Sequence, residues 1–229
     1  MRTTRTIAMK SIKLCRFGLA VALSFSLSGV VKAQPTDLEG TWLNLRSERP
    51  RVELTPAGQE VAANYVPLRD DPDLQCQPAS LTNVIGIPDP PWEIRLHDDF
   101  VEMNFEYMDV KRRVPLSDST RPENAPYTAP DFPHMGRSVG RFEGDTLVVE
   151  TVDVGEGFAD TLVQMYPQSN QMKVEERYRA EGDTLMVEIK HTDPMYYEEP
   201  FTMRYEFFRV DLEVLEFGCA LEAANYSLP

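Results

Sequence analysis

The sequence predicts an all-β protein in which an antiparallel meander closes into a β-barrel. Hydrophobic and polar residues alternate in several short segments, which is typical of half-buried strands. Two nearly identical turns with the sequence Glu-Gly-Asp stand between such segments, as expected for hairpins. About eight strands can be counted, which is enough to close a barrel. Closure leaves no unpaired edge, so we expect a barrel, and a two-sheet sandwich is the competing arrangement.

The individual strands follow from the side chains that share a face. Two alternating segments flank a turn at Asp98-Asp99, a third lies near the C-terminus, and 214–219 is expected to form a last strand. The apolar faces of the three alternating segments consist of Trp92, Ile94 and Leu96, of Val101, Met103, Phe105 and Tyr107, and of Phe201, Met203, Tyr205 and Phe207.

The two Glu-Gly-Asp turns belong to a longer internal repeat. Residues 141–150 are nearly repeated at 179–188, with Gly144 and Gly182 at the same place in each copy. Gly adopts positive φ without steric cost, and Asp hydrogen-bonds its own backbone. The acids of these turns are therefore expected to shape the turns rather than to catalyse a reaction.

One short helix is expected near the N-terminus, from Pro56 to about Tyr65. Thr55 is a suitable N-cap, and Pro56 fits the first helical position. A long Pro-rich loop is expected at about 117–133. Loops of this length in compact domains often act as lids or binding loops, and an inert path over the surface is the other interpretation.

The first 33 residues are typical of a signal peptide. A basic start precedes an apolar run from Phe17 to Val31, and Ala33 stands before the expected cleavage position. The run is too short to span a bilayer comfortably. We therefore expect a signal peptide at 1–33, a single β-barrel domain at 34–229, and a periplasmic or secreted bacterial protein.

Charge and cysteine content limit the partners and the compartment. The net charge of −14 argues against nucleic acid and anionic lipid as partners, and no second long apolar run predicts membrane insertion. Cys76 and Cys219 remain after the leader. In an oxidising compartment two such cysteines usually pair, so we expect a disulfide; a reactive thiol or a metal ligand is the alternative.

Glu176 and His191 are two polar residues on otherwise apolar strand faces. A two-residue loop, either Glu181-Gly182 or Gly182-Asp183, places both residues on the same side of the hairpin. With the Gly182-Asp183 loop, Glu176 lies opposite Ile189 and His191 is its diagonal neighbour. A carboxylate and an imidazole in one apolar cavity could do general acid–base chemistry. The alternatives are an internally satisfied polar pair, a Glu176 that forms a salt bridge with an interior Arg, and a His191 at the rim.

Other candidates for a site are spread along the chain. Glu106 is a second candidate base and His134 a second candidate acid, and no cofactor or metal is expected because no established cofactor motif is present. Asp70, Asp71 and Asp73 offer oxygens for Ca²⁺ but do not match an EF-hand. The candidate ligand contacts are Phe105, Tyr107, Arg113, Arg137 and Tyr178.

Gly40-Thr41-Trp42 resembles the Gly-x-Trp motif that opens the first strand of lipocalins and other calycins. In that family the Trp plugs one end of the barrel, and an Arg from a late strand stacks over it. The resemblance implies a lipocalin-like (calycin) barrel. Arg204 and Arg209 are the possible equivalents of that Arg.

A wider resemblance covers residues 54–219. The segment Gly136–Thr151, together with Cys76-Gln77-Pro78 and Glu176-Arg177-Tyr178, resembles an uncharacterised family of secreted bacterial proteins. Members of that family often have His where Arg137 stands and Trp where Phe142 stands. The resemblance implies export and a single domain, and it implies no particular reaction.

These observations lead to one leading hypothesis and two alternatives. The leading hypothesis is an exported barrel that binds a small, partly apolar molecule in its cavity. The first alternative is a cofactor-independent isomerase, cyclase, lyase or hydrolase that uses a Glu/His pair in the same cavity. The second is a structural protein associated with the cell envelope, with a filled core.

Overall fold

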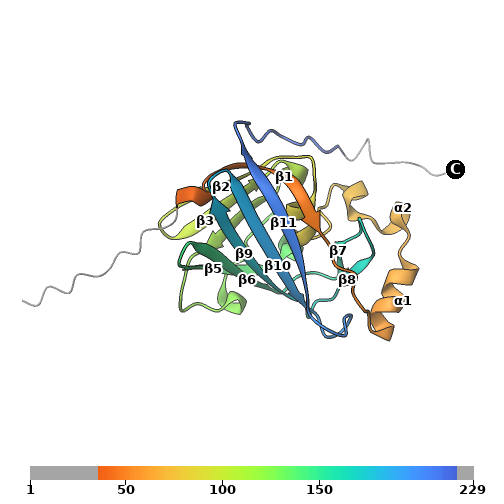
Figure 1. Ribbon diagram of the computed structural model, residues 1–229. Helices are drawn as coiled ribbons and strands as arrows, with labels where there is room; N and C mark the ends of the chain where they lie inside the picture. The colour runs from red at the N-terminus through yellow and green to blue at the C-terminus, as the bar shows by residue number, and fades with distance from the viewer. Residues whose placement is uncertain (1–35, 221–229) are drawn as a thin grey trace, which may run out of the picture. The chain divides into compact units, whose positions relative to one another are not determined.

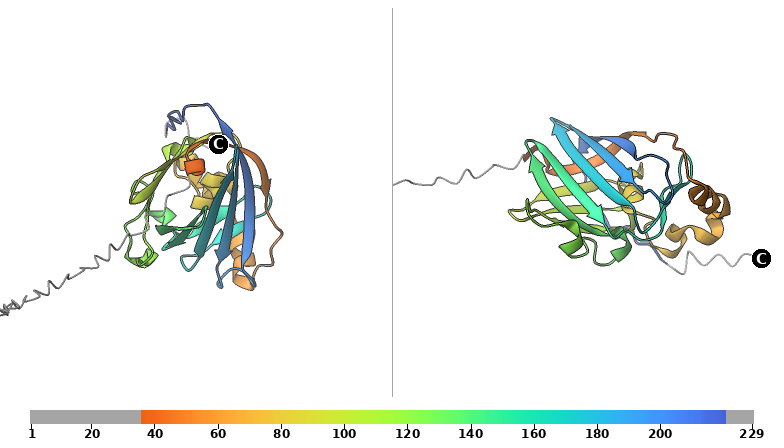
Figure 2. Two further views of the ribbon diagram at one scale, coloured as in Figure 1. Left: turned by 60° about the vertical axis from the view of Figure 1, so that its left-hand side comes forward. Right: turned by 90° about the horizontal axis from the view of Figure 1, so that it is seen from below.

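The computed structural model describes residues 36–220, and its main feature is a nine-stranded antiparallel sheet. The sheet curves around a core, as the left view of Figure 2 shows. The strand order is β4-β3-β2-β1-β11-β10-β9-β6-β5 (Figure 1). The strands are β1 (Gly40–Glu48), β2 (Trp92–Leu96), β3 (Phe100–Phe105), β4 (Lys111–Pro115), β5 (Arg137–Glu143), β6 (Thr146–Val152), β9 (Lys173–Glu181), β10 (Thr184–Thr192) and β11 (Phe201–Val210).

The two end strands, β4 and β5, meet along a seam that nearly closes the barrel. Leu116, directly after β4, forms a β-bridge with Gly140 of β5. The N–H of Ser117 also donates to the carbonyl of Gly140 at 2.9 Å. The predicted antiparallel barrel is thus confirmed, and the two-sheet sandwich is excluded.

The Pro-rich loop predicted at about 117–133 runs along this seam. The carbonyl of Thr128 accepts the N–H of Arg113 at 2.8 Å, and Tyr127 forms a bridge with Arg137 of β5. The 3₁₀ turns in and after the loop are η4 (Pro122–Asn124) and η5 (Pro133–Met135). The loop supplies backbone hydrogen bonds to both end strands, which favours a structural role over that of a lid.

The β9–β10 hairpin has the predicted two-residue loop. Gly182 and Asp183 form this loop, and Gly182 has a φ of 59°. The resulting register places Glu176 opposite Ile189, as predicted. The β5–β6 hairpin repeats the turn, with Gly144 at a φ of 68°.

Helices and a small second sheet lie at one end of the barrel (Figure 1). The predicted N-terminal helix is present, with Thr55 as its N-cap, but two further helices were not predicted. One of these, α3, has all six of its residues buried, so it plugs this end of the barrel. The elements here are α1 (Pro56–Asn64), α2 (Pro67–Asp70), η2 (Pro72–Gln75), α3 (Leu81–Gly86), β7 (Gly157–Asp160) and β8 (Tyr166–Gln168).

Arg49 and Ser80 hold α3 in the barrel end. Nε of Arg49 forms a buried salt bridge of 2.6 Å with Asp160, and Nη2 donates to the carbonyl of Gly86 at 2.9 Å. The hydroxyl of Ser80, which caps α3, donates to the carbonyl of Ala159 at 2.8 Å. These bonds tie the plug to the end of β1 and to β7.

The opposite end is closed by Trp42, next to η1 (Thr36–Leu38). Trp42 is fully buried, and its Nε1 donates to the carbonyl of Leu38 at 3.1 Å. The guanidinium of Arg209 lies 4.2 Å from the centre of the Trp42 ring, as the calycin resemblance implied for one of the two Arg candidates. Gly40 has a φ of 138°, and a Cβ there would collide with Arg209, so the Gly of the motif makes room for the Arg.

The segment after β11 does not form the strand predicted at 214–219. Both neighbours of β11 are already strands of the barrel, so this segment has no sheet edge with which to pair. The N–H groups of Leu215 and Phe217 donate instead to the carboxylates of Glu106 and Asp109, at 3.0 and 2.9 Å.

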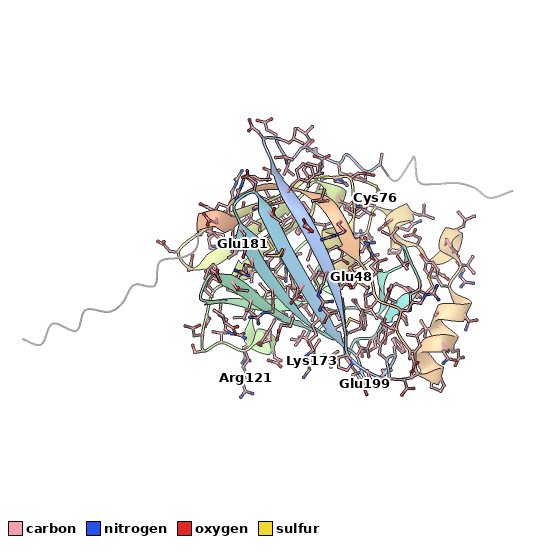
Figure 3. All side chains as sticks on the ribbon, viewed as in Figure 1. Glu48, Cys76, Arg121, Lys173, Glu181 and Glu199 are labelled. Atoms are coloured by element: carbon pink, nitrogen blue, oxygen red, sulfur yellow. A yellow bond between two sulfur atoms is a disulfide. The ribbon has the colours of Figure 1, made fainter. Side chains whose placement is uncertain are left out.

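The predicted disulfide between Cys76 and Cys219 is confirmed, with a Cα–Cα distance of 5.8 Å. It fastens the C-terminal tail to the end of η2, where Cys76 is labelled in Figure 3. A disulfide is compatible with an extracellular or periplasmic protein. The signal peptide predicted at 1–33 lies outside the described residues. Among residues 36–220 no helix is long and apolar enough to cross a membrane.

Candidate functional site

Arg112, Ser138, Thr151, Glu176 and Tyr178 form the interior cluster, a set of buried polar side chains inside the barrel. Arg112 and Glu176 are joined by two bonds, Nη1 to Oε2 at 2.6 Å and Nη2 to Oε1 at 2.7 Å. The hydroxyls of Tyr178 and Thr151 donate to Oε2 and to Oε1, and Ser138 accepts from Arg112. Each oxygen of the Glu176 carboxylate therefore has two donors.

The protonation of the interior cluster follows from burial and from the salt bridge. Burial alone would lower the pKa of Arg112, but the charge of Glu176 and its hydrogen bonds outweigh burial and raise that pKa. Burial, reinforced by the same negative charge, raises the pKa of Tyr178 well above its ordinary value. At neutral pH Arg112 is therefore charged, and Tyr178 is a neutral donor.

His191 belongs to a different set of contacts, at the plugged end of the barrel. Its ring is fully buried and stacks on Phe201, with ring centroids 4.5 Å apart and an interplanar angle of 8°. Nε2 lies 2.8 Å from the hydroxyl of Thr82 in α3. Burial lowers the pKa of His191 to about 3, so the imidazole is neutral at pH 7 and anchors the plug through a hydrogen bond.

Glu176 and His191 thus lie on the predicted apolar faces but do not meet in one site. The carboxylate is bound by Arg112, which is one of the alternatives that the sequence left open. The imidazole is bound to Thr82. The geometry therefore gives no support to a dyad in which these two side chains act on one molecule.

The candidates Phe105, Glu106 and Tyr107 face three different surroundings. Phe105 ends β3 and stacks on Trp92 in the core, with ring centroids 5.1 Å apart. Glu106 accepts a backbone N–H from the C-terminal tail. Tyr107 begins η3 (Tyr107–Asp109) instead of continuing the strand face as predicted, and its hydroxyl donates to Asp73.

The candidates Arg113 and Arg137 lie beside the seam. The guanidinium of Arg113 lies 3.6 Å from the centre of the Phe100 ring. That of Arg137 lies 4.0 Å from the centre of the Tyr127 ring and donates to the carbonyl of Ala125 at 2.6 Å. Arg137 thus holds the Pro-rich loop in place, and neither side chain joins the interior cluster.

A pocket of about 300 Å³ lies at the helical end of the barrel, and we name it the end pocket. The rings of Tyr65 and Phe158 form one wall, with centroids 4.5 Å apart and an interplanar angle of 59°. His134 also lines the pocket, and its Nε2 lies 2.8 Å from the carbonyl of Pro78. The residues that line the end pocket are Tyr65, Asp70, Asp71, Pro72, Asp73, Gln77, Pro78, Ala79, Asn83, His134, Glu156, Gly157, Phe158 and Thr161.

One buried oxygen atom of the end pocket lacks a hydrogen-bond partner among the described residues. It is Oδ1 of Asn83, a residue that is only 6% exposed. A buried acceptor without a partner costs about 1–3 kcal/mol. Unlike the unpartnered nitrogens Nε of Arg112, Nε1 of Trp92 and Nδ1 of His191, it belongs to a residue that lines the end pocket.

The end pocket has a negative electrostatic potential. Burial raises the pKa of Tyr65 to about 12, and the charges of Asp71, Asp73 and Asp70 add to the shift. Burial also raises the pKa of Asp73, with a contribution from Asp71, while the hydrogen bonds from the Tyr107 hydroxyl and the Ala79 backbone oppose the shift. Within the described chain, no Lys or Arg lines this pocket.

A larger hollow of about 690 Å³ lies on the outer face of the sheet, and we name it the outer groove. Glu48, Arg204, Glu188 and Arg177 are successive partners across four neighbouring strands, and Figure 3 labels Glu48 on this face. Nε of Arg204 lies 2.8 Å from Glu188. Acids and bases alternate along this row, so each of these four charges has an opposite charge as its neighbour.

The end pocket was not found from the sequence. Its lining comes from segments that are far apart in the sequence and meet only in the fold. The acidic run from Asp70 to Asp73 was the one sequence feature that pointed to this region. In the fold these carboxylates do not converge on one point. Within residues 36–220 no group of three or more His, Cys, Asp or Glu side chains could hold a metal ion.

Comparison with known proteins yields structural likenesses only. No family model matches the chain, and no curated protein matches it. Apo lipid binding protein 8 of Caenorhabditis elegans is 12% identical, with 76% of this chain and 96% of that chain covered and a TM-score of 0.39. The REP1-NXSQ fatty acid transporter is 12% identical, with 77% and 98% covered and a TM-score of 0.41.

A variant of the fluorescent protein UnaG is 13% identical, with 77% of this chain and 98% of that chain covered and a TM-score of 0.36. Identities and scores this low carry no argument about what the present chain binds. The barrel described above therefore rests on the strand pairing of this chain itself.

Proposed function

We propose that this chain is an exported binding protein that holds a small, partly apolar molecule in the end pocket. The observation that carries the proposal is a pocket lined by a pair of aromatic rings and by the buried Oδ1 of Asn83, which lacks a partner among the described residues. Small-molecule sites are typically concave and combine apolar walls with a few polar groups. A volume of about 300 Å³ is at the lower end of the usual range for such sites.

The proposal moves the ligand from the interior of the barrel, where the sequence placed it, to the barrel end. Inside the barrel, Trp92 packs on Phe105 and Phe207, with ring centroids 5.1 and 5.3 Å apart. Both oxygens of the Glu176 carboxylate are bound by donors within the protein. A ligand gains little from groups that already have good partners.

The two alternative functions make different demands on the molecule. The enzyme hypothesis requires an available base and a titrating acid, whereas Glu176 is bound by Arg112 and the pKa of His191 is about 3. The hypothesis of a structural envelope protein requires no ligand, so it does not account for the unpartnered Oδ1 of Asn83 in the end pocket. We therefore favour binding over both alternatives.

Export is part of the proposal and rests on two features. The sequence of residues 1–33 is typical of a signal peptide. The disulfide between Cys76 and Cys219 suits an oxidising compartment.

Native mass spectrometry of the exported protein tests the proposal. A Cβ added at Gly157 has its nearest neighbour, the carbonyl oxygen of Ala79, at 3.9 Å, so Gly157→Phe can fill the end pocket. Met186→Phe adds a ring to the outer groove and is the matched control. We expect a co-purifying small molecule on the parent protein and on Met186→Phe, and none on Gly157→Phe.

Two results would contradict the proposal. A ligand retained by Gly157→Phe would mean that binding occurs elsewhere on the protein. A ligand absent from all three proteins, together with no thermal stabilisation in a screen of small molecules, would favour the structural alternative.

A further inference from the structure

The end pocket carries uncompensated negative charge. Asp71, Asp73 and Glu156 line it, and none of the three has a salt-bridge partner in the described part of the chain. Asp70 also lines the pocket but is paired with Arg69 at 2.6 Å. Neighbouring carboxylates repel one another, so a bound cation relieves their repulsion.

Part of the lining of the end pocket is aromatic. The rings of Tyr65 and Phe158 pack against each other at one side of the pocket. The face of an aromatic ring carries partial negative charge and attracts a cation, most strongly where water is excluded. The ring wall and the carboxylates therefore favour the same sign of charge in a ligand.

The unsatisfied buried atom of the pocket is an acceptor. Oδ1 of Asn83, on a side chain more than nine-tenths buried, has no donor among the described residues. An ammonium group has only donors to offer, so its N–H bonds would satisfy such an oxygen. A carboxylate or phosphate has no donor for it and would be repelled.

From these three observations we infer that the end pocket is selective for an organic cation, a protonated amine attached to an apolar group. This inference rests on the function proposed above, because it names the class of ligand for the same pocket. A metal ion fits less well, because the carboxylates do not converge and the aromatic wall offers no ligand atom to it. The apolar group of such an amine packs against the rings of Tyr65 and Phe158, and its ammonium group donates hydrogen bonds to the oxygens.

The test uses three probes of nearly equal size and different charge. They are 2-phenylethylamine, 2-phenylethanol and 3-phenylpropionate, and their binding to the purified mature protein is measured by isothermal titration calorimetry. We expect the amine to bind at least tenfold more tightly than the alcohol, and the carboxylate not to bind. Gly157→Phe is expected to abolish binding of the amine.

Matched variants that remove one negative charge locate the selectivity. Asp71→Asn should weaken the amine about three- to tenfold and leave the alcohol unchanged, and Asn can still accept the N–H of Asp73 that Asp71 now accepts. Asp183→Asn is the control, because it removes the same charge from an exposed turn side chain outside the end pocket. It should change neither affinity.

The outcomes separate this inference from the proposed function. Equal affinities for amine and alcohol, both lost in Gly157→Phe, would overturn the cation selectivity and leave the binding function intact. Amine binding that survives Gly157→Phe, or that Asp183→Asn weakens as much as Asp71→Asn, would overturn the assignment to this pocket. Displacement of the amine by millimolar Ca²⁺ would identify a metal site instead.

Discussion

The interior cluster and the end pocket both place polar groups in largely apolar surroundings, but they differ in how those groups are satisfied. In the interior cluster each oxygen of Glu176 has two donors, and its charge is matched by Arg112, although Nε of Arg112 has no partner among the described residues. In the end pocket no Lys or Arg faces the carboxylates, and Oδ1 of Asn83 has no donor among the described residues. Burial of a polar group is therefore a poor guide to a binding site, whereas unpaired charge beside an unmet acceptor is a better one.

The comparison predicts that changes in the interior cluster act on stability and that changes in the end pocket act on binding. The predictions below are ordered by the size of the expected effect.

Arg112→Met should have the largest effect. It leaves the carboxylate of Glu176 buried without its counter-ion, and the free energy of unfolding should fall by about 3–5 kcal/mol. Urea denaturation measures the loss. In the double variant Arg112→Met, Glu176→Leu no charge is left unpaired, so most of the loss should be recovered. A double variant as unstable as the single one would show that the salt bridge is not what the core requires.

Removal of the disulfide should have the next largest effect. The double variant Cys76→Ser, Cys219→Ser frees the C-terminal tail, and the free energy of unfolding should fall by about 2–4 kcal/mol. The same urea experiment measures it. A thiol assay on the denatured, unreduced mature protein should find no free thiol, and two equivalents would refute the bridge.

The titration of His191 should make stability depend on pH. The pKa of its ring is about 3 in the folded protein and about 6.5 in the unfolded chain, so the unfolded chain binds a proton first as pH falls. The contribution of His191 to stability should therefore fall by about 2 kcal/mol between pH 8 and pH 5. His191→Gln does not titrate, and the difference in unfolding free energy between parent and variant should shrink over this range. A difference independent of pH would contradict the assignment.

Asn83→Leu should act in the opposite direction on stability. It removes a buried acceptor that has no partner among the described residues, so the ligand-free protein should gain about 1 kcal/mol while ligand binding is lost. Thermal unfolding with and without 2-phenylethylamine measures both effects. A loss of stability together with unchanged binding would show that Asn83 serves the fold.

Arg204→Gln should have the smallest effect. Its ion pair with Glu188 lies on the exposed outer face, where such pairs contribute less than about 1 kcal/mol and are screened by salt. Urea denaturation at low and high salt measures the change. A loss above 2 kcal/mol would mean that the outer groove has a larger role in the fold than its exposure indicates.

Local patterns predicted much of the barrel. Alternation gave the faces of β3, β10 and β11, and Gly182 gave the loop that sets the register of Glu176. The resemblance of Gly40-Thr41-Trp42 to the calycin motif predicted an Arg stacked on Trp42, and Arg209, one of the two candidates, is that residue. Each of these features depends on neighbours in sequence, or on a pairing that a two-residue turn dictates.

The plug and the end pocket could not be predicted in this way. All residues of α3 are buried, so the helix has no polar face to produce a periodic pattern, and it is too short for its propensity to be informative. Tyr65, Asn83, His134 and Phe158 meet only because the barrel is closed. Glu176 binds Arg112 instead of His191, and the sequence could not identify this partner because Arg112 lies on β4, far from Glu176 along the chain.

The strand that begins the barrel is hydrogen-bonded to the strand that completes it, since β1 lies between β2 and β11. Until β11 has left the ribosome, one edge of β1 has no partner strand, and the barrel cannot close. Pairing two strands that lie so far apart in the sequence costs loop-closure entropy and makes folding slow. The complete barrel therefore forms only after β11 has been synthesised.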